Sequence, residues 1–95
     1  MKDIVRNHYV YEDGAHAWLC VKRDVFGGLG IEDKISPYSY KDWLYVYLEE
    51  DCDAGVYIKA WEKKYGTKFK TKGEVYENYP CFVRNLESYS AGGLK

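Results

Sequence analysis

The stretch of sequence that decides the fold is residues 43–66, which read WLYVYLEEDCDAGVYIKAWEKKYG. Its first six residues alternate: Leu44, Val46 and Leu48 share one face, and tryptophan and tyrosine side chains share the other. Because side chains on a strand point alternately to its two faces, this period of two predicts a β-strand over residues 43–48. The pattern leaves open whether the aromatic face belongs to the core or to an interface.

An amphipathic helix is predicted directly after this strand, beginning at Asp51 or Asp53 and ending at Tyr65. Its apolar residues recur at i, i+3, i+4, i+7 and i+11, a spacing that places side chains on one face of a helix. A carboxylate at the start can cap free backbone N–H groups and lies at the positive end of the helix dipole. Gly66 supplies the left-handed residue with which many helices end. The predicted apolar stripe consists of Ala54, Tyr57, Ile58, Trp61 and Tyr65.

A hairpin is predicted on the N-terminal side of this unit. Residues 15–22 alternate with one strongly apolar face, and Trp18 on the other face indicates a strand that is covered on both sides. The preceding residues 4–11 are rich in β-branched and aromatic side chains, and residues 12–14 form a turn signal. These segments together predict a hairpin within residues 4–22.

The rest of the chain is expected to supply a short helical turn and two further strands. Asp24 is positioned to cap a turn over residues 25–29, whose glycines limit its length. Residues 31–39 are expected to be a loop. Residues 69–77 and 81–86 are predicted to be two antiparallel strands, joined by the Asn-Tyr-Pro sequence that separates them.

These elements predict an α+β fold, in which a small antiparallel sheet of four to five strands has one main helix packed on one face. A chain of 95 residues forms a single domain, and the patternless residues 88–95 are expected to be a flexible tail. The three cysteines are odd in number and scattered, which favours a reducing compartment. With no apolar leader and no long apolar run, we expect a cytoplasmic protein without a membrane partner.

Charge and aromatic content favour a binding function. The formal net charge of −1 hides an acidic segment, residues 31–58, followed by a basic one, residues 59–72. Aromatic residues make up 18% of the chain, and eleven of them are tyrosines, which are common at interface hot spots. The acidic run has three interpretations: helix capping, an acidic partner-binding surface, or a cation site whose spacing fits no calcium loop. The predicted partner-binding residues are Asp42, Trp43, Tyr45, Tyr47, Glu49, Glu50 and Asp51.

A nucleic-acid-binding module is an alternative. The basic segment carries lysines on the exposed face of the predicted helix and on alternate positions of the next predicted strand. Two basic surfaces meeting near Gly66 would bind phosphates. A sequence pI near 6.1 counts against this function, and lysines often line a solvated face. The residues of this alternative site are Lys59, Lys63, Lys68, Lys70 and Lys72.

Residues for catalysis are few. His16 and Cys20 lie two pleats apart on one strand face, too far for a direct hydrogen bond. Cys52 lies at a helix start that lowers a thiol pKa, but the surrounding carboxylates raise it again. The cysteines and histidines lack paired spacing for zinc, and the glycines of residues 27–30 lack the rest of a phosphate-loop motif. We therefore predict no catalytic residues, no metal and no cofactor.

Four short motifs carry a family resemblance: GAHAWL at residues 14–19, LGI at residues 29–31, ISPYSY at residues 35–40 and YLEEDCD at residues 47–53. This set resembles a family of small, functionally uncharacterised proteins carried by phages, plasmids and integrated elements. The resemblance implies a mobile-element context and brings no activity, cofactor or catalytic residue with it.

The sequence therefore predicts a non-enzymatic binding protein from a phage or mobile element, which acts stoichiometrically on a larger host protein. By analogy of context, that partner would be a nucleic-acid-binding defence enzyme, and the protein an inhibitor of the anti-CRISPR or anti-restriction type. A homodimeric accessory subunit is a further alternative.

Overall fold

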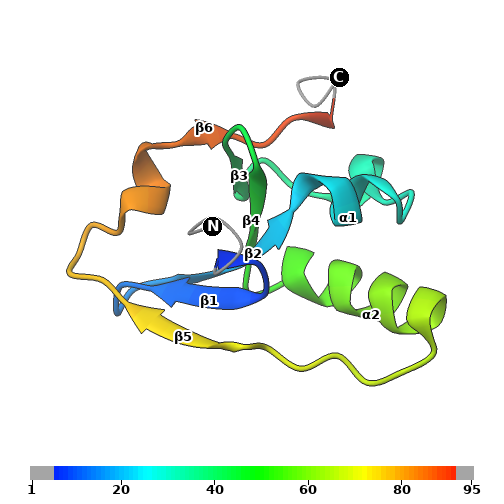
Figure 1. Cartoon of the computed structure of the whole chain (residues 1–95). Coiled ribbons are helices and arrows are strands. Elements are labelled where there is room, and N and C mark those ends of the chain that lie inside the picture. The colour runs from blue at the N-terminus through cyan, green and yellow to red at the C-terminus, as the bar shows by residue number, and fades with distance from the viewer. Residues whose placement is uncertain (1–5, 92–95) are drawn as a thin grey trace.

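The computed structural model describes residues 6–91. It has one six-stranded mixed sheet in the order β5-β1-β2-β4-β3-β6, with a single long helix, α2, packed against it (Figure 1). The predicted α+β class is confirmed, with one strand more than the four to five expected. None of the helices in this part of the chain is long and apolar enough to cross a membrane.

Three strands form the centre of the sheet. The predicted hairpin is confirmed: β1 (Tyr9–Glu12) pairs antiparallel with β2 (Ala17–Lys22). Strand β4 (Tyr45–Glu49) pairs antiparallel with the other side of β2. Residues 4 and 5 of the expected first strand lie outside the described residues.

The two edges of the sheet differ from the expectation. Strand β5 (Gly73–Tyr76) runs parallel to β1, whereas β6 (Glu87–Ser88) pairs with the short strand β3 (Tyr40–Lys41) at the opposite edge (Figure 1). The predicted antiparallel pair of residues 69–77 and 81–86 is therefore wrong.

The cause of this difference is a buried carboxylate far away in the sequence. Residues Phe82–Asn85 form a 3₁₀ turn, η3, and the backbone N–H of Cys81 donates to Asp13 Oδ2 at 2.9 Å. Arg84 binds the same carboxylate. These bonds hold the segment against the β1–β2 turn, so it cannot lie beside β5.

The alternation along β2 and β4 places side chains in two separate cores. Leu19, Val21, Val46 and Leu48 pack with Tyr57 of α2 on one face. On the opposite face, a second core covers the aromatic side of β4, so its two tyrosines are core residues. This second core contains Tyr11, Trp18, Cys20, Tyr45, Tyr47, Cys81 and Val83.

The helices begin and end close to the expected residues. Helix α1 (Arg23–Gly27) follows β2 directly, and its N-cap is Lys22, so the expected cap by Asp24 is wrong. Helix α2 (Asp53–Tyr65) ends at Gly66 with φ of 68°, as predicted. Within its expected apolar stripe, Tyr57 is fully buried and Ala54, Ile58 and Trp61 pack against the core, whereas Tyr65 is 49% exposed.

Two segments expected to be irregular contain ordered contacts. Residues Glu32–Lys34 of the expected loop form a 3₁₀ turn, η2. Tyr89, at the start of the expected flexible tail, is 4% exposed and donates its hydroxyl to the Glu32 carbonyl at 2.7 Å. Residues 92–95 lie outside the described residues.

Candidate functional site

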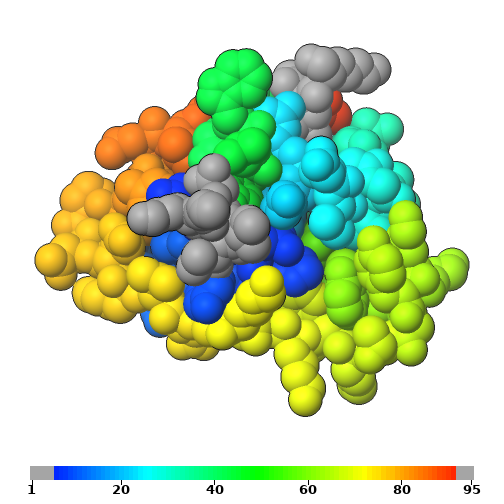
Figure 2. Space-filling model, viewed as in Figure 1, coloured from blue at the N-terminus to red at the C-terminus, as the bar shows by residue number. Residues whose placement is uncertain are grey.

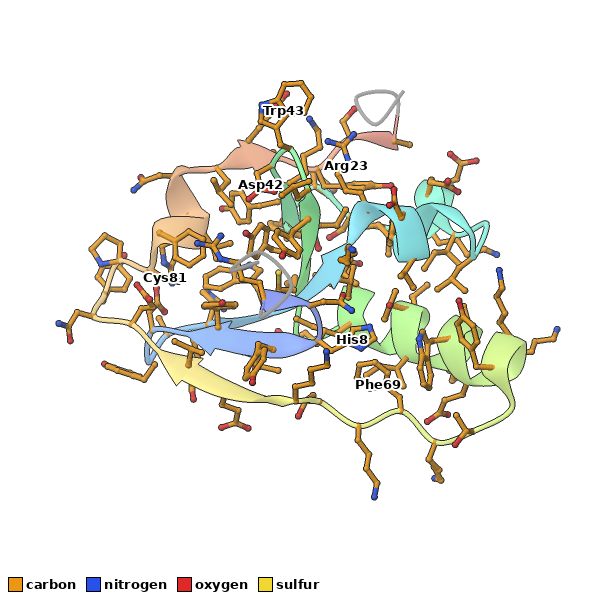
Figure 3. The ribbon with its side chains drawn as sticks, viewed as in Figure 1. His8, Arg23, Asp42, Trp43, Phe69 and Cys81 are labelled. Carbon is orange, nitrogen blue, oxygen red and sulfur yellow. The ribbon has the colours of Figure 1, made fainter. Side chains whose placement is uncertain are left out.

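Trp43 is the most exposed large apolar side chain among the described residues. It lies at the turn between β3 and β4, where 89% of its surface is exposed, and the adjacent Leu44 is 47% exposed. Figure 3 shows Trp43 pointing away from the body of the protein, and the green segment around residues 40–45 projects from the surface in Figure 2. A tryptophan exposed to this degree is unusual in a domain whose other two tryptophans are at least partly buried.

The turn that carries Trp43 is fixed by hydrogen bonds on both sides. Asp42 Oδ1 accepts the backbone N–H groups of Leu44 at 3.0 Å and Tyr45 at 2.8 Å, and its Oδ2 accepts the Tyr47 hydroxyl at 2.8 Å. Arg23 Nη1 donates to the carbonyl oxygens of Asp42 at 2.8 Å and Trp43 at 3.3 Å. The backbone around Trp43 is therefore set by the protein itself.

The predicted partner-binding residues do not form one surface. Tyr45 and Tyr47 are 2% and 0% exposed, so their predicted contact with a partner is wrong. Their aromatic face is covered by η3, which the sequence pattern did not reveal. Trp43 and Glu50 are exposed at opposite ends of β4, separated by roughly 20 Å at about 3.3 Å per residue.

The acids of residues 49–53 have different tasks from those predicted. Glu49 holds the turn that leads into α2: its carboxylate accepts the N–H groups of Asp51 at 2.8 Å and Cys52 at 3.1 Å, both before the helix, and of Asp53, the first helical residue, at 3.5 Å. Burial raises the pKa of Glu49, but these backbone hydrogen bonds outweigh it and hold that pKa below its usual value. The predicted capping by Asp51 or Asp53 is wrong.

Asp53 instead anchors the loop before β3. It is 2% exposed, and its Oδ2 accepts the hydroxyls of Ser36 and Ser39, each at 2.6 Å, and the Ser36 N–H at 3.0 Å. Glu50 and Asp51 therefore remain as the exposed acids of this run.

A cleft of about 560 Å³ opens beside this loop. It combines residues from the β1–β2 turn, β2, the loop before β3, β3, the end of β4, the turn before α2 and η3. Arg84 lies over the ring of Trp18, with 5.2 Å between its guanidinium carbon and the ring centroid, and pairs with Asp13 at 2.6 Å. The side chains that line the cleft are His16, Trp18, Ser36, Tyr38, Tyr40, Glu49, Asp51, Cys52 and Arg84.

Of the residues that line this cleft, only Glu49 and Asp51 are among the predicted partner-binding residues. The cleft brings together residues up to 68 positions apart, from His16 to Arg84, because η3 crosses the sheet. Three of the four motifs named above supply all the lining residues except Arg84: GAHAWL, ISPYSY and YLEEDCD.

The thiols and histidines do not assemble into a reactive set. Cys20 and Cys81 are buried, and burial raises the pKa of both thiols, whereas Cys52 is exposed. His8 Nε2 lies 2.8 Å from the Tyr57 hydroxyl and packs against Phe69 (Figure 3). Across residues 6–91, no group of three or more histidine, cysteine or acidic side chains is placed to hold a metal ion.

The lysines of the alternative site are exposed but are not arranged as predicted. Lys59 and Lys63 lie on the solvent side of α2. Lys68, Lys70 and Lys72 lie in the irregular connection before β5, so their expected common face on a strand is wrong. The alternation there did not form a strand, since β5 begins only at Gly73.

Comparison with known proteins adds no homologue: no protein family, curated protein or solved structure matches this chain. The assignment of function therefore depends on the two exposed features described above, the Trp43 turn and the cleft.

Proposed function

We propose that this chain is a non-enzymatic binding protein that occupies a surface on a larger protein, with Trp43 as its anchor. The observation that carries the proposal is the exposure of Trp43, 89%, on a turn held by five hydrogen bonds. Tryptophan is among the residues most enriched at interface hot spots.

The rigid turn supports this role energetically. A tryptophan side chain buries about 150–250 Å² when it enters a pocket on a partner. Because Asp42 and Arg23 already fix the backbone, little conformational entropy remains to be lost on binding. A flexible loop with the same tryptophan would bind more weakly.

The proposed biological context is a phage or other mobile element, and the proposed action is stoichiometric inhibition of a host defence nuclease. The resemblance of residues 14–60 to mobile-element proteins supports this context. The exposed acids Glu50 and Asp51 would speed association with a basic nucleic-acid groove, since electrostatic attraction mainly raises the rate of encounter.

The test compares wild type with Trp43→Ala and with the control Tyr76→Ala, which removes another exposed aromatic ring, 63% exposed, on β5. Each variant is expressed in cells that restrict a phage or plasmid by a CRISPR or restriction nuclease. We expect wild type and Tyr76→Ala to block restriction. Trp43→Ala should bind the co-purifying nuclease at least about 30-fold more weakly, the effect of losing a hot spot.

Equal binding by all three proteins would contradict the anchoring role of Trp43. Equal melting temperatures for the three proteins would show that the substitution leaves the fold intact. Sedimentation at two concentrations checks whether the partner is a second copy of the chain. If wild type forms a dimer and Trp43→Ala does not, the partner bound by Trp43 is a second copy of this chain and not a host protein.

A nucleic-acid-binding module is the second candidate, favoured by the exposure of all six lysines in residues 59–72. Binding through these lysines would weaken steeply as salt is raised. A gel shift with single- and double-stranded DNA at about 50 mM salt tests it. No shift at that salt concentration would remove this candidate.

A further inference from the structure

One cationic side chain on the lining of the cleft, Arg84, is already held by aromatic rings and a carboxylate. The Arg84 guanidinium lies 5.2 Å from the ring centroid of Trp18 and 4.7 Å from that of Tyr79. Its charge is balanced by Asp13, which is 2% exposed and accepts hydrogen bonds from Nε at 2.6 Å and Nη2 at 3.2 Å. Two aromatic rings and one carboxylate thus hold an arginine side chain that lines the cleft, and Trp18 is the one of these three groups that lines the cleft itself.

Two further aromatic rings line the cleft, and the Tyr40 ring packs edge-on against Trp18 with 6.1 Å between the ring centroids. Tyr38 is 75% exposed and Tyr40 is partly exposed, and both rings line the cleft. Two carboxylates, Glu49 and Asp51, also line the cleft. Arg84 is the only lysine or arginine among the described residues that line the cleft, and its charge is already neutralised by Asp13.

The remaining charge of the cleft is therefore negative. Glu49 stays ionised at neutral pH, because three backbone N–H groups stabilise its charged form. A positively charged guest would interact with both carboxylates and with the faces of the tyrosine rings, where cations are attracted by the ring quadrupole. An anionic guest would be repelled.

We propose that this cleft is a second binding site, which takes an arginine side chain from an extended segment of a partner protein. Arginine fits better than lysine, because its planar guanidinium stacks on aromatic rings and forms paired hydrogen bonds with a carboxylate. The volume of about 560 Å³ accommodates one long side chain and its neighbouring backbone.

The loop that carries the tyrosines is held in place before a guest arrives. Ser36 donates its N–H and its hydroxyl to Asp53, and the Tyr38 N–H donates to Ser36 Oγ at 3.2 Å. Ser39 is bonded to the same carboxylate. Tyr38 therefore starts from a fixed backbone, which lowers the entropy lost on binding.

The site is independent of the Trp43 anchor, since Trp43 does not line the cleft. The test uses three capped tripeptides, acetyl-Gly-Arg-Gly-amide and the matching lysine and glutamine peptides, added to isotope-labelled protein up to about 10 mM. We expect saturable NMR shifts of the Trp18 indole and the 36–40 amides with the arginine peptide. The lysine peptide should bind more weakly, and the glutamine peptide should not saturate.

Two variants separate the cleft from general surface acidity. Asp51→Asn should weaken arginine-peptide binding about threefold or more, the effect of losing one exposed charge partner. Tyr38→Ala should have a similar effect through loss of the stacking ring. Glu50→Gln is the matched control, because Glu50 is exposed beside Asp51 but does not line the cleft.

Cys52 provides a second readout, since it lines the cleft and is the exposed thiol of the chain. The arginine peptide should slow its alkylation by iodoacetamide in wild type and in Trp43→Ala alike. The proposal is overturned if the glutamine peptide binds as well as the arginine peptide, if Glu50→Gln and Asp51→Asn weaken binding equally, or if no saturable shift is seen. The nuclease assay tests the Trp43 anchor, and the peptide experiments test the cleft. A negative result in one leaves the other proposal standing.

Discussion

Asp13 and Arg84 are 71 residues apart in the sequence and meet at 2.6 Å between Oδ2 and Nε. The Asp13 carboxylate also accepts the backbone N–H groups of Ala15, His16 and Cys81. One buried side chain therefore fixes both the β1–β2 turn and the position of η3, which forms one side of the cleft.

Replacing Asp13 by Asn should destabilise the protein strongly at neutral pH. Asparagine keeps the size but carries no charge and can accept fewer hydrogen bonds, so Arg84 and a buried N–H group lose their partner. We expect the melting temperature to fall by about 10 °C. Thermal unfolding measures it, with Asp24→Asn, an exposed acid of α1, as the control.

The Asp13–Arg84 pair should make the stability of the fold depend on pH in the acidic range. The hydrogen bond from Arg84 holds the pKa of Asp13 far below its ordinary value. Because the folded state then binds fewer protons than the unfolded state, the stabilisation is present above about pH 4 and is lost as the pH falls below it. Asp13→Asn should lose less further stability than wild type between pH 5 and pH 2; an equal loss would contradict this assignment.

Replacing Ser39 by Ala should loosen the cleft wall and destabilise the fold. The Ser39 hydroxyl donates to Asp53 at 2.6 Å and accepts the Glu49 N–H at 2.9 Å in a fully buried position. A buried N–H group left without an acceptor costs about 1–3 kcal/mol. Urea unfolding should show a loss of this size, whereas the exposed control Ser88→Ala should unfold at the wild-type midpoint.

His8 should make the stability depend on pH near neutrality. Burial among the rings of Tyr57, Trp61 and Phe69, together with the nearby charge of Lys72, lowers its pKa. A lowered pKa means that the unfolded state binds the proton more readily. The stability that neutral His8 contributes is therefore fully present above the unfolded-state pKa of about 6.5. It is lost as the pH falls from that value toward the folded-state pKa.

The test compares urea midpoints at pH 7.5 and 5.5 for wild type, His8→Asn and His16→Asn. Asparagine suits position 8, because His8 has φ of 71° and asparagine tolerates this left-handed conformation. Wild type and His16→Asn should lose more stability on acidification than His8→Asn. The same loss in all three proteins would assign the effect to other groups.

Local patterns predicted the centre of the fold but not its edges. The alternation in residues 17–22 and 45–49 and the helical stripe ending at Gly66 depend on neighbours in the sequence, and all three elements formed. Strand β5 is aligned by β1, more than 60 residues away, and η3 by Asp13. No local pattern encodes such partners, because the contacts exist only after the chain has folded.

The candidate site was partly predictable for the same reason. Trp43 was named from its strand pattern, but the same pattern grouped it with Tyr45 and Tyr47, which are buried. Alternation shows which side chains share a face and not what covers that face. The cleft is assembled from four separate stretches of the chain, residues 16–18, 36–40 and 49–52 and Arg84, and its two tyrosines appeared in the sequence only as part of a general excess of tyrosine.

Substitutions in the acidic run of residues 49–53 test which carboxylate stabilises the start of α2. Glu49→Ala removes the acceptor for the N–H groups of Asp51, Cys52 and Asp53 in the turn that leads into α2, so we expect a loss of about 0.5–2 kcal/mol, similar in size to the loss of a helix cap. Glu50→Ala, its exposed neighbour, should change stability by less than about 0.5 kcal/mol. Urea unfolding at pH 7 measures both. Since the pKa of Glu49 is lowered, its contribution is present above about pH 4.3 and is lost below it, so the two variants should converge in acid. A loss in Glu50→Ala equal to that in Glu49→Ala would mean that overall negative charge near the helix start, rather than the Glu49 hydrogen bonds, stabilises α2.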